Sequence, residues 1–65
     1  MYSNNHGLYI AAIFKDSNEL MYLTEKGQFS KHSWRGHRFS PDFDFEYAIN
    51  LLEKKYKTAV FMRAF

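Results

Sequence analysis

Residues 8–14 of the chain are Leu8-Tyr9-Ile10-Ala11-Ala12-Ile13-Phe14, and this run decides the fold. It is apolar at odd and even positions alike, it is too short for a stable helix, and it carries aromatic and β-branched side chains. A strand that is apolar on both faces is typical of the interior of a sheet, where both faces are covered. The sequence therefore predicts a central strand over residues 8–14.

Two further strands are expected to follow this run as a meander. Residues 15–19 contain Asp, Ser and Asn, which hydrogen-bond their own backbone and tolerate turn conformations. A second strand is predicted over residues 20–24. Gly27 then allows the positive φ of a tight reversal, and a third strand begins within residues 28–31.

The next predicted element is a helix that begins at Ser40-Pro41. A serine oxygen accepts a hydrogen bond from a free N–H at a helix start, and proline at the first helical position loses no bond. Acids crowd the start of the predicted helix and lysines crowd its end, which is the arrangement that the helix dipole favours. The expected apolar face comprises Phe45, Ala48, Ile49, Leu52 and Tyr56, and the expected solvent face comprises Glu46, Asn50, Glu53, Lys54 and Lys57.

Residues 58–65 form a second β-rich run at the other end of the chain. A terminal strand stays ordered where it pairs, so we expect this run to lie against the strand over residues 8–14. The whole pattern predicts one α+β domain over residues 1–65. It consists of an antiparallel β-meander, one amphipathic helix packed on one sheet face and a C-terminal strand, in the order β-β-β-α-β.

Composition excludes several classes of protein. The 65 residues include no cysteine, so neither a disulfide nor a thiolate zinc site is available. The longest apolar run, residues 8–14, is far shorter than the roughly 20 residues that span a membrane. The first residues show no signal-peptide pattern. We therefore expect a cytoplasmic protein with no membrane partner.

The small size of the chain bears on self-association. A chain of 65 residues buries a smaller share of its surface on folding than a larger one, so its stability needs added support. Aromatic residues, which make up 20% of the chain, a partner, or a second copy would supply it. The sequence leaves open a monomer and a homodimer formed through the open sheet edge or the uncovered sheet face.

The segment of residues 31–38 is the strongest candidate for a contact surface. It holds three cations, two histidines and the only tryptophan, without one acid. Tryptophan and arginine are enriched among the residues that dominate protein interfaces. The alternative for the tryptophan is a place in the core under the helix. The predicted anchors are Trp34, Arg35 and Arg38, with Lys31, His32 and His37 in support.

Metal binding and catalysis would draw on neighbouring residues. A zinc site would draw on His32 and His37, with His6, Asp42 and Asp44 as further candidate ligands. Two histidines five apart in an extended segment, however, face opposite sides. Acid–base chemistry by the two aspartates and a histidine needs a desolvated pocket, for which so small a domain has little depth. We therefore expect no metal, no cofactor and no enzymatic activity.

Nucleic-acid binding is the alternative function for residues 31–38. Lys31, Arg35 and Arg38 would hold phosphates while Trp34 stacks on a base. The net charge is only +2, acids follow the segment directly, and the motifs of known nucleic-acid-binding domains are missing from the sequence. A protein partner is therefore expected first, and a nucleic acid or nucleoprotein second.

The hairpin sequence Tyr22-Leu23-Thr24-Glu25-Lys26-Gly27-Gln28-Phe29-Ser30, followed by Arg38-Phe39-Ser40 and a helix, resembles a pattern common in small phage-encoded proteins. The likeness covers about residues 20–65. The chain departs from the pattern at Trp34-Arg35-Gly36, and Ala48 lies further past the serine than usual. The resemblance implies a modulator or inhibitor that binds a host or defence protein complex stoichiometrically, as inhibitors of host RNA polymerase, of restriction and of CRISPR effector complexes do. It transfers no functional residues.

Overall fold

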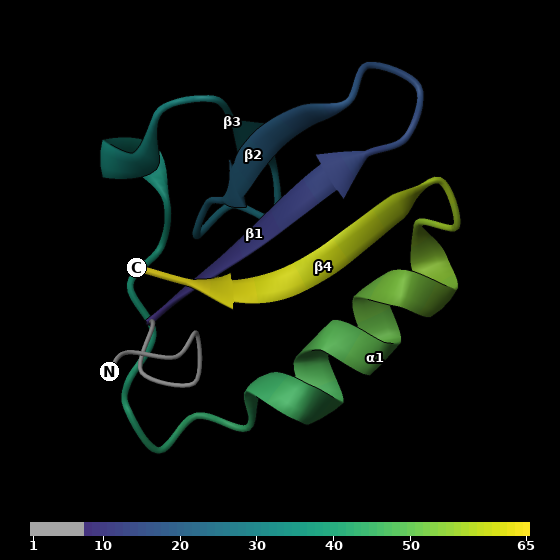
Figure 1. Ribbon diagram of the computed structural model, residues 1–65. Helices are drawn as coiled ribbons and strands as arrows, with labels where there is room; N and C mark the ends of the chain where they lie inside the picture. The colour runs from purple at the N-terminus through teal and green to yellow at the C-terminus, as the bar shows by residue number, and fades with distance from the viewer. Residues whose placement is uncertain (1–7) are drawn as a thin grey trace, which may run out of the picture.

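The elements of the chain follow one another in the predicted order, in a computed structural model that describes residues 8–65. The predicted α+β class with its β-β-β-α-β order is confirmed, and the strand ends differ from the predicted ones by at most two residues. In the described residues the elements are β1 (Tyr9–Phe14), β2 (Glu19–Leu23), β3 (Phe29–Ser30), the short 3-10 helix η2 (Ser33–Arg35), α1 (Phe45–Lys55) and β4 (Ala59–Ala64), shown in Figure 1.

β1 is the central strand, as predicted from its apolar run. The strand order is β3-β2-β1-β4, and each neighbouring pair is antiparallel. Ala12 of β1 lies opposite Met21 of β2 and Phe61 of β4, which confirms that the last strand pairs with the first. Strands on both sides leave little of β1 exposed, and Ile10, Ala11 and Ala12 expose 1% or less of their surface.

The two reversals adopt the backbone conformations that their residues favour. Asn18 precedes β2 with a φ of 59°, and Gly27 lies between β2 and β3 with a φ of 79°. Both values fall in the left-handed region, which asparagine tolerates and glycine enters without a steric penalty. These turns bring β1, β2 and β3 side by side and so establish the meander.

α1 covers one face of the sheet and lies beside β4 (Figure 1). The buried residues Ile10, Ala12 and Phe61 of that face meet Phe45, the buried first residue of α1. The predicted apolar stripe of the helix is confirmed, since its other members pack against the same core. They are Ala48, Ile49 and Leu52, followed by Tyr56 just past the helix end.

The predicted helix start at Ser40-Pro41 is wrong. α1 begins at Phe45, and Asp44 is its N-cap, with a side-chain oxygen that accepts a hydrogen bond from the Tyr47 N–H at 3.1 Å. Ser40 belongs to a preceding turn, where its carbonyl oxygen accepts from the Phe43 N–H at 3.0 Å. The Ser40 hydroxyl donates to the Asp42 carboxylate and lowers the pKa of that carboxyl.

Packing of three phenylalanines explains this later start. The ring centroid of Phe39 lies 4.4 Å from that of Phe43 and 5.7 Å from that of Phe45. The turn after Ser40 places the rings of Phe39 and Phe43 against Phe45. A helix that began at Pro41 would replace this turn. The aromatic cluster therefore outweighs the favourable capping chemistry of serine and proline.

Replacing Asp44 with alanine is expected to cost about 1 kcal/mol of stability, because it removes the acceptor of an N-cap hydrogen bond. Thermal unfolding of Asp44→Ala and Ser40→Ala, followed by circular dichroism, tests this assignment. The Ser40 variant loses two hydrogen bonds to Asp42 within an exposed turn and should melt closer to the parent protein. A larger loss for Ser40→Ala would contradict a helix start at Phe45.

The outer edge of β4 is partly protected by the helix and its last turn. The Phe61 N–H donates to a Glu53 carboxylate oxygen at 3.4 Å, and the Ala59 N–H donates to the Tyr56 carbonyl oxygen at 3.3 Å. A strand edge normally leaves such donors for pairing with another chain. Here two of them already have acceptors within the same molecule.

Candidate functional site

The segment of residues 31–38 is held against the sheet by backbone hydrogen bonds at its far end. The His37 N–H donates to the Leu23 carbonyl oxygen of β2 at 2.8 Å, and the Phe39 N–H donates to the Leu8 carbonyl oxygen before β1 at the same distance. Within the segment, the Arg35 N–H donates to the His32 carbonyl oxygen and the Gly36 N–H donates to the Ser33 carbonyl oxygen, each three positions back and at 3.0 Å. The side chains of this segment therefore stand on a fixed backbone.

Trp34 is on the surface. Its side chain is 72% exposed, the highest value among the large exposed apolar residues of the described chain, which overturns the alternative of a core position. The His32 ring stacks on the indole with centroids 5.1 Å apart, and the Arg35 guanidinium carbon lies 5.0 Å from the indole centroid. These three residues, His32, Trp34 and Arg35, form the Trp34 cluster.

Gly36 allows η2 to approach the sheet closely. A Cβ atom at this position would lie 3.0 Å from the Tyr22 Cβ atom and 3.1 Å from the Tyr9 Cδ1 atom, closer than side chains normally pack. The two tyrosine rings are themselves in edge contact, with centroids 6.2 Å apart. Glycine at this position therefore sets how near the Trp34 cluster lies to the sheet.

Replacing Gly36 with alanine is expected to destabilise the protein by about 1–3 kcal/mol, the usual cost of overpacking. The new methyl group would press on Tyr9, Tyr22 and the Ser33 carbonyl oxygen, so these neighbours and the segment carrying Trp34 are expected to shift apart slightly. Thermal melting and the emission maximum of the single tryptophan report both effects. Lys26→Ala, in an exposed turn, is the control, and a Gly36→Ala protein with unchanged melting and emission would contradict the close approach.

The other predicted site residues take different positions. Lys31 forms an ion pair with Glu19, with Nζ and Oε2 3.0 Å apart. His37 is partly buried, and its ring meets the edge of Phe39 at a centroid distance of 4.5 Å. Arg38 lines a separate depression beside Tyr9. The structure thus brings together His32, Trp34 and Arg35 and spreads Lys31, His37 and Arg38 around them.

A groove of about 390 Å³ adjoins the Trp34 cluster. One wall comes from the cluster, and the other comes from the β2–β3 hairpin, whose turn residues sequence reasoning did not include. Its charged side chains are of both signs, with a glutamate and a lysine from the hairpin and an arginine from the cluster. The lining residues are Thr24, Glu25, Lys26, Gln28, Trp34 and Arg35.

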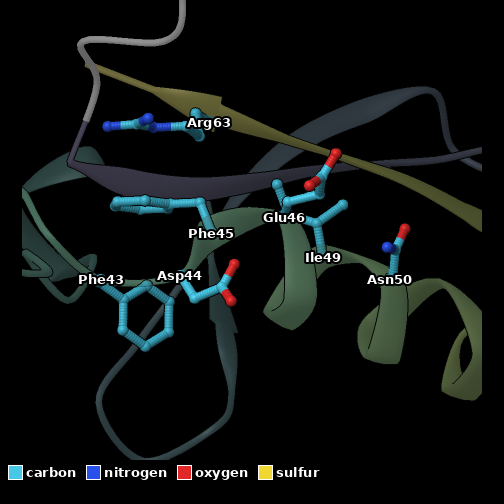
Figure 2. A pocket seen from close by; sticks show the side chains of 7 residues that line it. All are labelled: Phe43, Asp44, Phe45, Glu46, Ile49, Asn50 and Arg63. Carbon is cyan, nitrogen blue, oxygen red and sulfur yellow. The ribbon is translucent and has the colours of Figure 1, made fainter.

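A second depression, of about 370 Å³, lies at the first turn of α1. Figure 2 shows Arg63 of β4 lying over the ring of Phe45, and the guanidinium carbon is 4.0 Å from the ring centroid. Phe45 belongs to the core, and the Asp44 carboxylate caps the helix. These side chains have structural roles, so the groove beside Trp34 is the stronger candidate for a functional site.

The described residues hold neither a cluster of metal-binding side chains nor a membrane-spanning helix. Within residues 8–65 no three histidine or acidic side chains gather in a way that would hold a metal ion, and His6 lies outside the described residues. Asp42 and Asp44 are engaged by Ser40 and by the helix start. The same residues 8–65 include no helix with the length and apolar character needed to cross a membrane.

The described residues thus form a small α+β domain with a shallow groove of mixed charge beside the exposed Trp34. Comparisons with models of known protein families, with curated proteins and with solved structures found no match.

Proposed function

We propose that this chain is a small non-enzymatic binding protein that attaches to a protein partner through the Trp34 cluster and its groove. The observation that carries the proposal is the 72% exposure of Trp34 between His32 and Arg35. Burying an aromatic side chain of this size against a partner contributes a large favourable binding free energy. Tryptophan and arginine are enriched among the residues that dominate interface energetics.

The charges around the cluster favour a protein over a nucleic acid. Lys31 is paired with Glu19, and the groove carries Glu25 beside Lys26 and Arg35. A nucleic-acid surface concentrates unpaired positive charge along the path of the phosphates. Mixed charges suit a protein surface, where complementary pairs select the partner.

Binding without catalysis is supported by Asp42, one of the two aspartates considered for acid–base chemistry. Asp42 accepts a hydrogen bond from Ser40, and its pKa is lowered. A general base that works near neutral pH needs a pKa shifted upward, by burial in most cases. Asp42 is exposed and shifted in the opposite direction.

The resemblance of residues 20–65 to small phage-encoded proteins adds a class of partner. It supports a modulator or inhibitor that works in the cytoplasm by stoichiometric binding to a host or defence protein complex. This part of the proposal rests on the hairpin motif and the Arg38-Phe39-Ser40 motif, whereas the binding surface rests on the geometry around Trp34.

Affinity capture from a bacterial host lysate tests the proposal. The tagged protein and its Trp34→Ala, Arg35→Ala double variant serve as baits, each in nuclease-treated and untreated lysate. We expect one or a few proteins to be retained by the parent bait in both lysates and lost from the variant. Retention that disappears after nuclease treatment, or binding that falls steeply with salt, would support nucleic acid instead. Equal capture by both baits would contradict the site.

A further inference from the structure

The helix α1 carries two large apolar side chains on the side that faces away from the sheet. Tyr47 and Leu51 are 62% and 48% exposed, whereas the stripe that begins at Phe45 packs on the core. Residues four apart stand above one another on a helix, so these two side chains form one patch. The water-facing side of a surface helix is normally polar. An apolar patch of this kind favours a contact with another molecule.

Opposite charges stand at the two ends of this patch. Asp44, the N-cap, lies three residues before Tyr47, and Lys54 lies three residues after Leu51. Both charged side chains are exposed, and within residues 8–65 no carboxylate lies within ion-pair distance of the Lys54 ammonium group. The order along this face of the helix is therefore acid, tyrosine, leucine, base.

We propose that two copies of this chain pair through this face of α1, as a homodimer with antiparallel helices. A two-fold axis at the level of Ile49 brings together positions that lie equally far before and after that residue. Tyr47 and Leu51 lie two positions from it on either side. Asp44 and Lys54 likewise lie five positions from it on either side. Each tyrosine therefore packs on the leucine of the other chain, and each aspartate lies near the lysine of the other chain.

The order of the charges is what commits this face to a second copy. Reversing the direction of the second helix places an acid opposite a base at both ends of the contact and opposes the two helix dipoles. The same order also stabilises the single helix, since acids favour its start and lysines its end. A different partner would need the reversed order at the same spacing, whereas a second copy always carries it. This proposal concerns a different surface from the Trp34 cluster and does not depend on the proposed function.

The small size of the contact predicts a weak dimer. α1 has 11 residues and is therefore about 16 Å long. Two helices of this length bury less than the roughly 1,200 Å² at which stable specific interfaces begin. We therefore expect a dissociation constant of about 0.1–1 mM, which corresponds to a transient dimer.

The other surfaces of the described chain are less suited to a second copy. At the β4 edge, the Phe61 and Ala59 N–H groups already donate to acceptors in the same molecule, and the β3 edge is only two residues long. On the sheet face turned away from α1, Gly36 lies close against Tyr22, and Ala11 is fully buried. The exposed face of α1 is therefore the better surface for pairing.

Sedimentation velocity from about 10 μM to about 2 mM tests the dimer with two matched variants. Leu51→Glu places a carboxylate within the patch, near Asp44 of the second copy. Val60→Glu makes the same change on the sheet face turned away from α1, at a residue of similar exposure, 44% against 48%. We expect the parent protein and Val60→Glu to approach twice the mass of one chain. Leu51→Glu should remain monomeric, with a dissociation constant raised at least about tenfold by the buried charge.

A second pair of variants tests the contact between Asp44 and Lys54 and does not depend on the folding of the first pair. Lys54→Glu and Lys57→Glu change the net charge by the same amount, and Lys57 lies beyond the end of α1. Only Lys54→Glu should weaken the dimer, because it alone places two acids opposite each other.

Three results would overturn the pairing of α1 with a second copy. The first is a parent protein that stays monomeric over the whole concentration range. The second is a dimer that Val60→Glu disrupts and Leu51→Glu does not, which would place the contact on the sheet. The third is equal weakening of the dimer by Lys54→Glu and Lys57→Glu, which would mean that net charge and not a specific pair controls association.

Discussion

Replacing Phe61 with alanine is expected to remove most or all of the stability of the fold. Phe61 is 5% exposed, and its ring lies 6.0 Å from the rings of both Phe29 and Tyr56. Its cross-strand neighbour Ala12 is too small to fill the cavity that would remain. Such a truncation costs about 3–5 kcal/mol, while a chain of this length has a total stability of roughly 3–10 kcal/mol.

Urea denaturation followed by circular dichroism measures this loss. Phe65→Ala is the matched control, since it deletes the same side chain at a position that is 59% exposed. Surface substitutions usually change stability by less than about 0.5 kcal/mol. Equal losses for the two variants would mean that the core is not centred on Phe61.

The Trp34→Ala, Arg35→Ala double variant is expected to lose its partner without losing its fold. Interface anchors contribute about 2–4 kcal/mol or more, which corresponds to roughly 30- to 700-fold in affinity. Trp34 is 72% exposed and outside the core, so its loss should leave the melting temperature nearly unchanged. Calorimetric titration of the captured partner, together with thermal melting, measures both quantities.

A second double variant controls for the removal of an aromatic and a cation. Tyr47 is 62% exposed on α1, and Lys54 lies exposed on the same helix. Tyr47→Ala with Lys54→Ala should bind the partner like the parent protein. Weaker binding by this variant alone would move the contact surface to α1, and unfolding of the Trp34 variant would make Trp34 a structural residue.

The fold was largely predictable because a continuous apolar run and a helical periodicity are both clear in the sequence. The run over residues 8–14 is apolar at every position, and β1 lies inside the sheet. Spacing of three and four residues from Phe45 to Tyr56 identified the buried stripe of α1. Both patterns depend on which side chains meet the core, and the core dominates the energetics of a small domain.

The helix start was not predictable from local chemistry. Ser40, Asp42 and Asp44 are all residue types that cap helices, and proline after the first of them favoured the earliest start. In the folded protein Phe39 and Phe43 pack on each other across the turn that precedes the helix, and Phe39 also packs on Phe45. These contacts belong to the tertiary structure.

The candidate site was predictable in composition but not in shape. Trp34 is exposed and not in the core, while the role of residues 31–38 as a contact surface stays a prediction. Its groove, however, needs Thr24 and Gln28 from the hairpin, which lie beside η2 because the His37 N–H donates to Leu23. The ion pair of Lys31 with Glu19 likewise joins residues that only the folded sheet brings together.

The pairing of β1 with β4 determines when the protein can fold during its synthesis. Tyr9 lies opposite Ala64, so β1 acquires its second neighbour only after β4 has been synthesised. Two of the six buried core residues, Ala59 and Phe61, are also made late. Joining such distant segments carries an entropy cost of loop closure that local contacts do not offset. Folding is therefore slower than for a chain held together by local contacts. The emerging chain therefore cannot complete its core until β4 has left the ribosome.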